Sequence, residues 1–81
     1  MKSAYGVAAL IRKDNLILSV ARRKNPTMFG LPGGKRERHE TEEEACIREI
    51  KEETGLVITN LKEVFRDHCG SNKAVTFTCD Y

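Results

Sequence analysis

Residues 41–55 contain the signals for both ends of a single α-helix. Thr41 is followed three positions later by Glu44, a capping box in which hydroxyl and carboxylate satisfy two free backbone amides. Gly55 offers the left-handed conformation that commonly ends a helix. The sequence therefore predicts a helix from Glu42 to about Thr54, and the rest of the chain must be built around it.

The length of the chain limits what this helix can belong to. Its 81 residues are enough for one small domain and too few for two. The sequence is 40% hydrophobic and 32% charged, which is typical of a folded globular protein. No apolar run approaches the roughly 20 residues of a membrane-spanning helix, so we expect no membrane partner.

Short apolar runs on both sides of the helix predict strands. Residues 6–11 and 16–21 are expected to form two strands of a hairpin. Residues 25–34 are rich in glycine and proline and are expected to be mostly loop. After the helix, the last two strands are expected at residues 61–69 and 73–79.

One face of the predicted helix is acidic. With about 100° between successive residues, Glu49, Glu52 and Glu53 share an arc of roughly 100°. A cluster of carboxylates suits a hard divalent cation such as Mg²⁺ or Mn²⁺. An ordinary glutamate-rich helix explains this arrangement of carboxylates on a helical wheel equally well. The acidic arc adjoins an apolar stripe instead of opposing it, and this stripe consists of Cys46, Ile47 and Ile50.

The spacing of the charged residues is more specific than the helix face. Gly34 is followed by five residues and Glu40, then by seven residues and the run REIKEETGL at 48–56. This pattern, G-x5-E-x7-R-E-U-x-E-E-x-G-U with U apolar, resembles the Nudix box, the signature of the MutT-like Nudix hydrolases. Every fixed position is filled, and the preceding residues 31–33 (LPG) are similar to the usual lead-in.

The resemblance implies a fold and an activity. The fold is a Nudix-type α/β (α+β) domain, an α/β/α sandwich around a mixed sheet, with residues 1–81 as a single domain. The activity is hydrolysis of a pyrophosphate bond in a nucleoside diphosphate linked to another group, with Mg²⁺ or Mn²⁺ as cofactor. The short segment before the box favours nucleoside triphosphates or dinucleoside polyphosphates as substrates.

By position in the box, the resemblance also assigns the metal-binding and catalytic residues. Glu52 and Glu53 correspond to the main metal ligands. Glu49 corresponds to a further ligand or to the residue that orients the attacking water. In many family members the backbone carbonyl at the position of Gly33 completes the coordination. The implied catalytic set is Arg48, Glu49, Glu52 and Glu53.

Other positions of the box are implied to support this site. Arg48 and Glu40 are expected to form an ion pair that braces the loop against the helix. Gly34 is expected to permit the tight loop, and Gly55 to end the helix.

Basic residues outside the helix are candidates for binding substrate phosphate, because Arg and Lys beside a metal site commonly do so. These candidates are Arg22, Arg23 and Lys35. A solvated strand end explains the two arginines equally well. A charged surface loop explains Lys35, Arg36 and Arg38.

Nudix domains are usually longer, with further strands and a second helix after the box. We therefore expect the C-terminal part of the usual fold to be missing, which would leave an unpaired sheet edge. Such an edge favours a homodimer or a complementing partner chain. The alternative function is a non-catalytic Nudix-like module that binds a nucleotide or a partner. Its usual sign is a broken box, and this box is intact.

The cysteines and aromatic residues narrow the remaining possibilities. Cys46, Cys69 and Cys79 are odd in number and have no CxxC spacing, which argues against a disulfide framework or a zinc site. Reduced thiols indicate a cytoplasmic protein. The aromatic content of 6%, without basic residues interleaved, makes a nucleic-acid partner unexpected.

Overall fold

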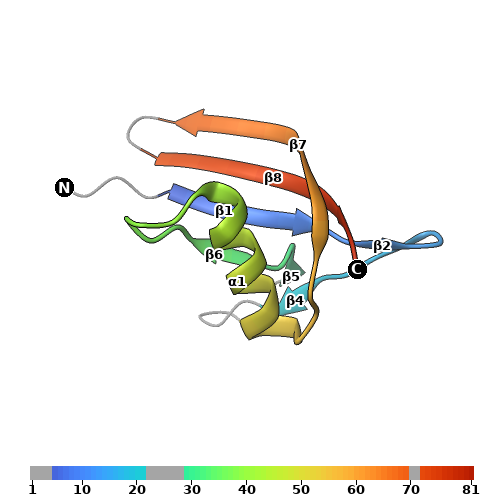
Figure 1. Cartoon of the computed structure of the whole chain (residues 1–81). Coiled ribbons are helices and arrows are strands. Elements are labelled where there is room, and N and C mark those ends of the chain that lie inside the picture. Colours follow the sequence, from blue (N-terminus) through green and yellow to red (C-terminus); the bar gives the residue numbers. More distant parts are fainter. Residues whose placement is uncertain (1–4, 22–28, 70–71) are drawn as a thin grey trace.

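The computed structural model describes residues 5–21, 29–69 and 72–81 (Figure 1). Within these ranges the helix is α1 (Glu42–Thr54). The strands are β1 (Tyr5–Leu10), β2 (Arg12–Lys13), β3 (Leu16–Ile17), β4 (Val20–Ala21), β5 (Phe29–Gly30), β6 (Gly33–Lys35), β7 (Thr59–Cys69) and β8 (Asn72–Asp80).

A mixed four-stranded sheet forms the centre of the molecule, in the order β6-β1-β8-β7. β1 runs parallel to β8 and antiparallel to β6, and β7 runs antiparallel to β8. The two short strand pairs β2–β3 and β4–β5 lie outside this sheet. The mixed sheet confirms the architecture that the sequence predicts.

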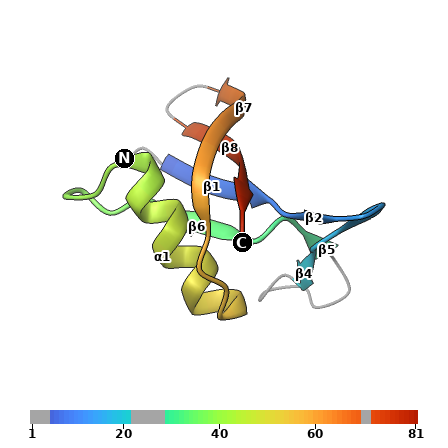
Figure 2. The ribbon, with the colours of Figure 1, turned by 45° about the vertical axis from the view of Figure 1, so that its right-hand side comes forward.

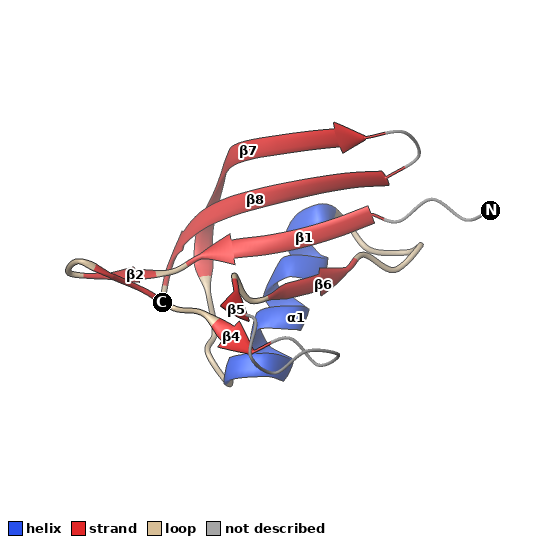
Figure 3. Cartoon of the chain, turned by 180° about the vertical axis from the view of Figure 1, so that it is seen from behind, coloured by secondary structure: helices blue, strands red, loops and turns tan. Residues whose placement is uncertain are grey.

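Helix α1 packs on one face of the sheet (Figures 1 and 2). Alternate residues of β1 and β8 are buried beneath it, as the two-residue period of a strand requires. Viewed from behind, the described chain places no helix on the other face (Figure 3). The buried core consists of Val7, Ala9, Ile11, Ala45, Cys46, Ile50, Ile58, Val75 and Phe77.

Helix α1 begins and ends where the sequence predicts. The Glu44 amide donates to the Thr41 hydroxyl oxygen at 3.1 Å, and the Thr41 amide donates to the Glu44 carboxylate at 2.8 Å. Gly55 has φ 79°, and its amide donates to the Lys51 carbonyl at 3.0 Å. Both caps thus set the helix length locally. No helix in the described part of the chain is long and apolar enough to cross a membrane.

The buried face of α1 differs from the predicted stripe at two positions. Ala45 is fully buried, whereas Ile47 is 37% exposed. The prediction for Ile47 was therefore wrong. The buried face is turned toward the side of Glu49, so it includes Ala45 with Cys46 and Ile50 and leaves Ile47 at its margin. The acidic arc consequently lies closer to the sheet than the helical wheel suggested.

The strand predictions before the helix were wrong in two details. β1 does not pair with residues 16–21, because β6 and β8 occupy both of its edges. The hairpin lies further along, where Asp14 takes φ 56° in the turn between β2 and β3. Of residues 25–34, expected to be mostly loop, residues 25–28 lie outside the described part of the chain, and the others contain β5 and the start of β6. A Cβ at Gly33 would collide with the backbone of Val7, so glycine lets β6 approach β1 closely.

Candidate functional site

Arg48 is the centre of a charged cluster between α1 and the loop that follows β6. Its Nε and Nη2 donate to the two carboxylate oxygens of Glu40, at 2.6 and 2.9 Å. Bidentate pairing of this kind is the strong form of the arginine–carboxylate interaction. Nη2 also donates to the Lys35 carbonyl at 3.2 Å, which ties the helix to β6. The ion pair expected between Arg48 and Glu40 is therefore present.

Glu40 is buried, with 9% of its surface exposed, and its carboxylate is well satisfied. The Glu37 amide donates a further hydrogen bond to it at 2.9 Å. The hydrogen bonds from Arg48, and then that from Glu37, lower the pKa of Glu40 from 4.5 to about 2. Hydrogen bonds to Glu40 and Glu49 raise the pKa of Arg48. Both groups stay charged near neutral pH, which suits a supporting pair and excludes proton transfer by it.

Arg48 also contacts two glutamates on its own helix. Its Nη1 donates to the Glu49 carboxylate at 2.8 Å and lies 3.4 Å from both carboxylate oxygens of Glu52. The Glu49 side chain is 18% exposed and that of Glu52 is 58% exposed. The guanidinium therefore holds Glu49 firmly and Glu52 loosely.

The acidic face of α1 lies against the glycines of β6. The Gly33 amide donates to the Glu53 carboxylate at 3.1 Å. The Glu49 carboxylate occupies the space that a Cβ on Gly34 would need. Gly34 lies in a strand, and its φ is not positive, so it provides space and not a tight turn.

The chemistry of this face fits a divalent cation. Glu49, Glu52 and Glu53 present hard oxygen donors, which Mg²⁺ and Mn²⁺ prefer. Glu40, Glu49 and Glu52 all contact Arg48, so negative charge is in excess around this one guanidinium. Among the described residues, no three acidic, histidine or cysteine side chains are already gathered as metal ligands. Glu52 and Glu53 are exposed and can turn, whereas Glu49 is fixed beside Gly34.

The remaining predicted site residues are placed as follows. Lys35 lies on β6 directly after Gly34, with an exposed side chain. Gly55 ends α1 in the left-handed conformation. Arg22 and Arg23, the candidate phosphate-binding arginines, lie outside the described residues.

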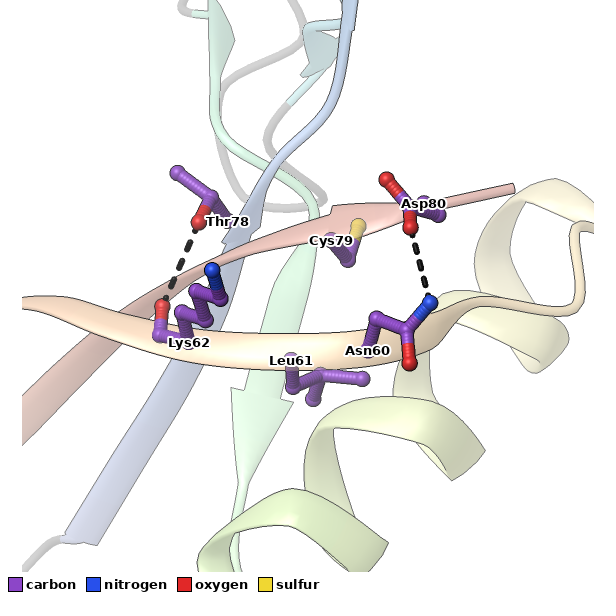
Figure 4. Close-up of a pocket in the computed structure, with 6 residues that line it drawn as sticks. All are labelled: Asn60, Leu61, Lys62, Thr78, Cys79 and Asp80. Atoms are coloured by element: carbon purple, nitrogen blue, oxygen red, sulfur yellow. Dashed lines mark hydrogen bonds between the residues drawn. The ribbon is translucent and has the colours of Figure 1, made fainter.

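A hollow lies between the start of β7 and the end of β8 (Figure 4). The strand register shifts between Thr59 and Lys62. Asn60 Nδ2 donates to the Asp80 carboxylate across the gap at 2.9 Å. The hollow is lined by Asn60, Leu61, Lys62, Thr78, Cys79 and Asp80. No residue of the acidic cluster belongs to this lining, so the hollow is separate from the candidate site.

Two cysteines are free thiols without a role in the site. Cys46 is fully buried, and burial raises its pKa to about 12. Burial also raises the pKa of Cys79. Both thiols therefore stay protonated and unreactive near neutral pH. Cys46 and Cys79 are not joined to each other by a disulfide.

Comparison with known proteins agrees with this geometry. The sequence model of the NUDIX domain matches residues 2–78. A protein of Methanocaldococcus jannaschii named ADP-ribose pyrophosphatase is 45% identical over 85 residues, which span 95% of this chain and 50% of the relative. The chain thus spans half the length of this curated relative.

Solved structures give the same result. A nudix hydrolase family member from Chromobacterium violaceum is 34% identical, with a TM-score of 0.81 over 98% of this chain and 51% of the other. The MutT NUDIX hydrolase from Burkholderia pseudomallei is 29% identical, with a TM-score of 0.86 over 100% of this chain and 69% of the other.

Proposed function

This chain belongs to the NUDIX domain family, and from that premise we propose that it hydrolyses a pyrophosphate bond in a nucleoside diphosphate linked to another group. Mg²⁺ or Mn²⁺ is the cofactor in this proposal. The observation that carries it is the acidic face of α1, where Glu49 fills the space left by Gly34 and Glu53 accepts from the Gly33 amide.

In this proposal Glu52 and Glu53 hold the cation. Glu49 is a further ligand or orients the attacking water, and the Gly33 carbonyl is a candidate for the remaining coordination. When bound, the cation would neutralise the negative charge of the pyrophosphate and of the transition state. The half-buried position of Glu49 supports its role, because a carboxylate fixed by Arg48 keeps one orientation.

The basic residues of the chain have two different roles in the proposal. Arg48 positions the glutamates and does not contact substrate, because its guanidinium is occupied by carboxylates and by the Lys35 carbonyl. The exposed Lys35 side chain would attract the substrate phosphates. Arg22 and Arg23 are proposed for the same role from the sequence alone.

ADP-ribose is the first substrate to test. It is suggested by the name of the relative that is 45% identical to this chain. Nucleoside triphosphates and dinucleoside polyphosphates, which the short segment before the box favours, come second. Both classes contain the same pyrophosphate linkage, so the glutamate face alone does not discriminate between them.

The proposal is tested by incubating the full chain with Mg²⁺ and each substrate at mildly alkaline pH. Cleavage of ADP-ribose should give AMP and ribose phosphate, whereas a nucleoside triphosphate should give the monophosphate and pyrophosphate. Glu53→Gln should lower turnover about 1000-fold. Glu43→Gln removes the same charge from an exposed position in the first turn of α1 and should retain it. A folded chain that binds Mn²⁺ and cleaves no substrate would instead support the non-catalytic module.

A further inference from the structure

Arg36, in the loop after β6, is more than a surface charge. Its side chain is half-buried, and its amide donates to the Tyr5 carbonyl at 2.7 Å, which extends the pairing of β6 with β1. Its guanidinium lies 4.7 Å from the centre of the Tyr5 ring, a distance typical of cation–π contacts. The buried Nε of Arg36 has no hydrogen-bond partner in the described chain. The ring is therefore a main part of its environment.

Arg36 also holds the turn that carries Glu40. Its Nη1 donates to the Glu40 carbonyl at 2.6 Å. The Glu40 amide donates to the Glu37 carbonyl at 3.1 Å, which closes the turn. Glu40 is thus held at two places, by Arg36 at its main chain and by Arg48 at its carboxylate.

Tyr5 is itself held in place by neighbouring strands. Arg66 of β7 donates from Nη1 to the Tyr5 hydroxyl oxygen at 3.1 Å. Lys73 of β8 pairs with Tyr5 in the sheet, and its Nζ lies 5.9 Å from the ring centre. The ring under Arg36 is therefore a fixed support that belongs to the sheet.

We propose that Arg36 and Tyr5 are positioning residues for the glutamate face of α1, a role that rests on the proposed function. The Tyr5 ring supports Arg36, Arg36 fixes the Glu40 turn, and Glu40 fixes Arg48. Arg48 then holds Glu49 in the orientation that a metal ligand needs. Neither Arg36 nor Tyr5 contacts the glutamates of the helix directly, so both act through the Glu40–Arg48 pair.

Positioning and simple electrostatics predict opposite results for Arg36→Met. Loss of a positive charge near the site should strengthen binding of a cation by electrostatics alone. Loss of a positioning residue should weaken it, by up to about tenfold, the lower end of the effect of removing a direct partner of a ligand. Binding of Mn²⁺ to the full chain, measured by electron paramagnetic resonance, gives the sign directly. Arg38→Met is the matched control, because Arg38 lies in the same loop with an exposed side chain and should bind at least as tightly as the original chain.

The role of Tyr5 is tested by a pair of substitutions. Tyr5→Phe keeps the ring and removes the hydroxyl that accepts from Arg66, and it should retain Mn²⁺ affinity. Tyr5→Leu removes the ring and should weaken binding as Arg36→Met does. Equal affinities for the two Tyr5 variants would overturn the part assigned to the ring.

The Arg48 Nε–H signal in an NMR spectrum provides a readout independent of metal. Its hydrogen bond to Glu40 should slow its exchange with water, and Arg36→Met should remove this protection while Arg38→Met keeps it. A folded chain that binds no Mn²⁺ would contradict the proposed function, and this signal would still decide the positioning role. Unchanged protection together with unchanged or tighter Mn²⁺ binding in Arg36→Met would overturn the proposal. If Arg36→Met does not fold, Arg36→Lys replaces it, because lysine keeps the charge without the planar guanidinium. Unchanged protection of the Arg48 Nε–H and unchanged Mn²⁺ affinity in Arg36→Lys would also overturn the proposal.

Discussion

Two arginines of this chain are bound in nearly the same way, and one of them lies in the candidate site. Arg48 donates to the carboxylates of Glu40 and Glu49 at 2.6–2.9 Å. Arg66 donates to those of Glu42 and Glu63 at 2.7–3.0 Å. In both cases hydrogen bonds to glutamates raise the pKa of the arginine. Bond geometry alone does not distinguish the two clusters.

Burial is the first difference between them. The Glu40 side chain is 8% exposed, whereas those of Glu42 and Glu63 are 24% and 43% exposed. An exposed ion pair contributes little to stability, whereas breaking a buried one leaves a charge without compensation. Breaking the Arg48 cluster should therefore destabilise the fold more than breaking the Arg66 cluster.

Charge balance is the second difference. Arg48 contacts three carboxylates, those of Glu40, Glu49 and Glu52, and the Glu53 carboxylate follows on the same helix at the Gly33 amide. Arg66 contacts two glutamates and reaches Tyr5, whose ring also lies near Arg36 and Lys73. The comparison indicates that an excess of negative charge beside the core, and not arginine–glutamate pairing, distinguishes a site for a cation.

The largest expected effect separates the two clusters by activity. Glu53→Gln should lower Mg²⁺-dependent hydrolysis about 1000-fold, because it removes a proposed metal ligand. Glu42→Gln makes the same change in the Arg66 cluster and should leave hydrolysis near its original rate. Initial rates on the best substrate measure both. Similar losses in the two variants would mean that the clusters do not differ in function.

Replacing each arginine should have the next largest effect. Arg48→Met should weaken Mn²⁺ binding about 100-fold, because Glu49 loses its partner. It should also lower the urea midpoint of unfolding roughly threefold more than Arg66→Met does, since it leaves the buried Glu40 unpaired. Titration with Mn²⁺ and urea unfolding test the two statements separately. A larger shift for Arg66→Met would contradict the argument from burial.

Adding one methyl group beside each cluster should give a smaller difference. Gly34→Ala places a Cβ where the Glu49 carboxylate lies and should lower activity about tenfold. Gly6→Ala, next to Tyr5, meets its nearest atom at 3.8 Å and should be tolerated. Activity and melting temperature of both variants provide the comparison. Full activity of Gly34→Ala would show that Glu49 does not depend on this space.

The smallest expected effect is confined to acid. The pKa of Glu40 is about 2 in the folded chain against an ordinary value of 4.5, so folding favours the ionised carboxylate. Its contribution is complete above pH 4.5 and is lost as the pH falls toward 2. Urea midpoints across this range should therefore fall more steeply for the original chain than for Glu40→Gln.

Hydrogen bonds from Arg66 lower the pKa of Glu63, so this exposed pair can be compared with the buried Glu40–Arg48 pair at acidic pH. Both partners of that pair are exposed, so added salt should reduce the Glu63 contribution before that of Glu40. Identical acid dependence of the original chain and Glu40→Gln, at low and high salt, would argue against a native-state role for the buried pair.

Features that depend on neighbouring residues could be predicted from the sequence. Thr41 and Gly55 set the ends of α1, and both caps are confirmed. The fixed spacing from Gly34 to Gly55 placed the glutamates on one helix face. These signals are local, because capping and helical periodicity involve residues a few positions apart.

Features that depend on distant parts of the chain could not be predicted. The sequence gives no sign that β1 pairs with β8. The paired residues Tyr5 and Lys73, for example, are about 68 positions apart in the chain. The contact of Arg36 with Tyr5 also joins distant parts of the chain, and an arginine in a loop resembles any surface charge. The role of Gly34 was missed for a related reason, because the space it leaves is defined by Glu49 on another element.

The two glycines of β6 lower the stability of this strand but leave space that a side chain would fill. Each glycine gives the unfolded chain additional conformational freedom and makes strand formation less favourable by roughly 0.5–1 kcal/mol relative to alanine. Gly34 thus weakens the strand in which it makes room for Glu49, and Gly33 does so where it lets β6 approach β1. Selection for thermal stability alone would replace Gly34, and selection for the reaction would restore it. Variants chosen for stability should therefore be screened for loss of function at this strand first.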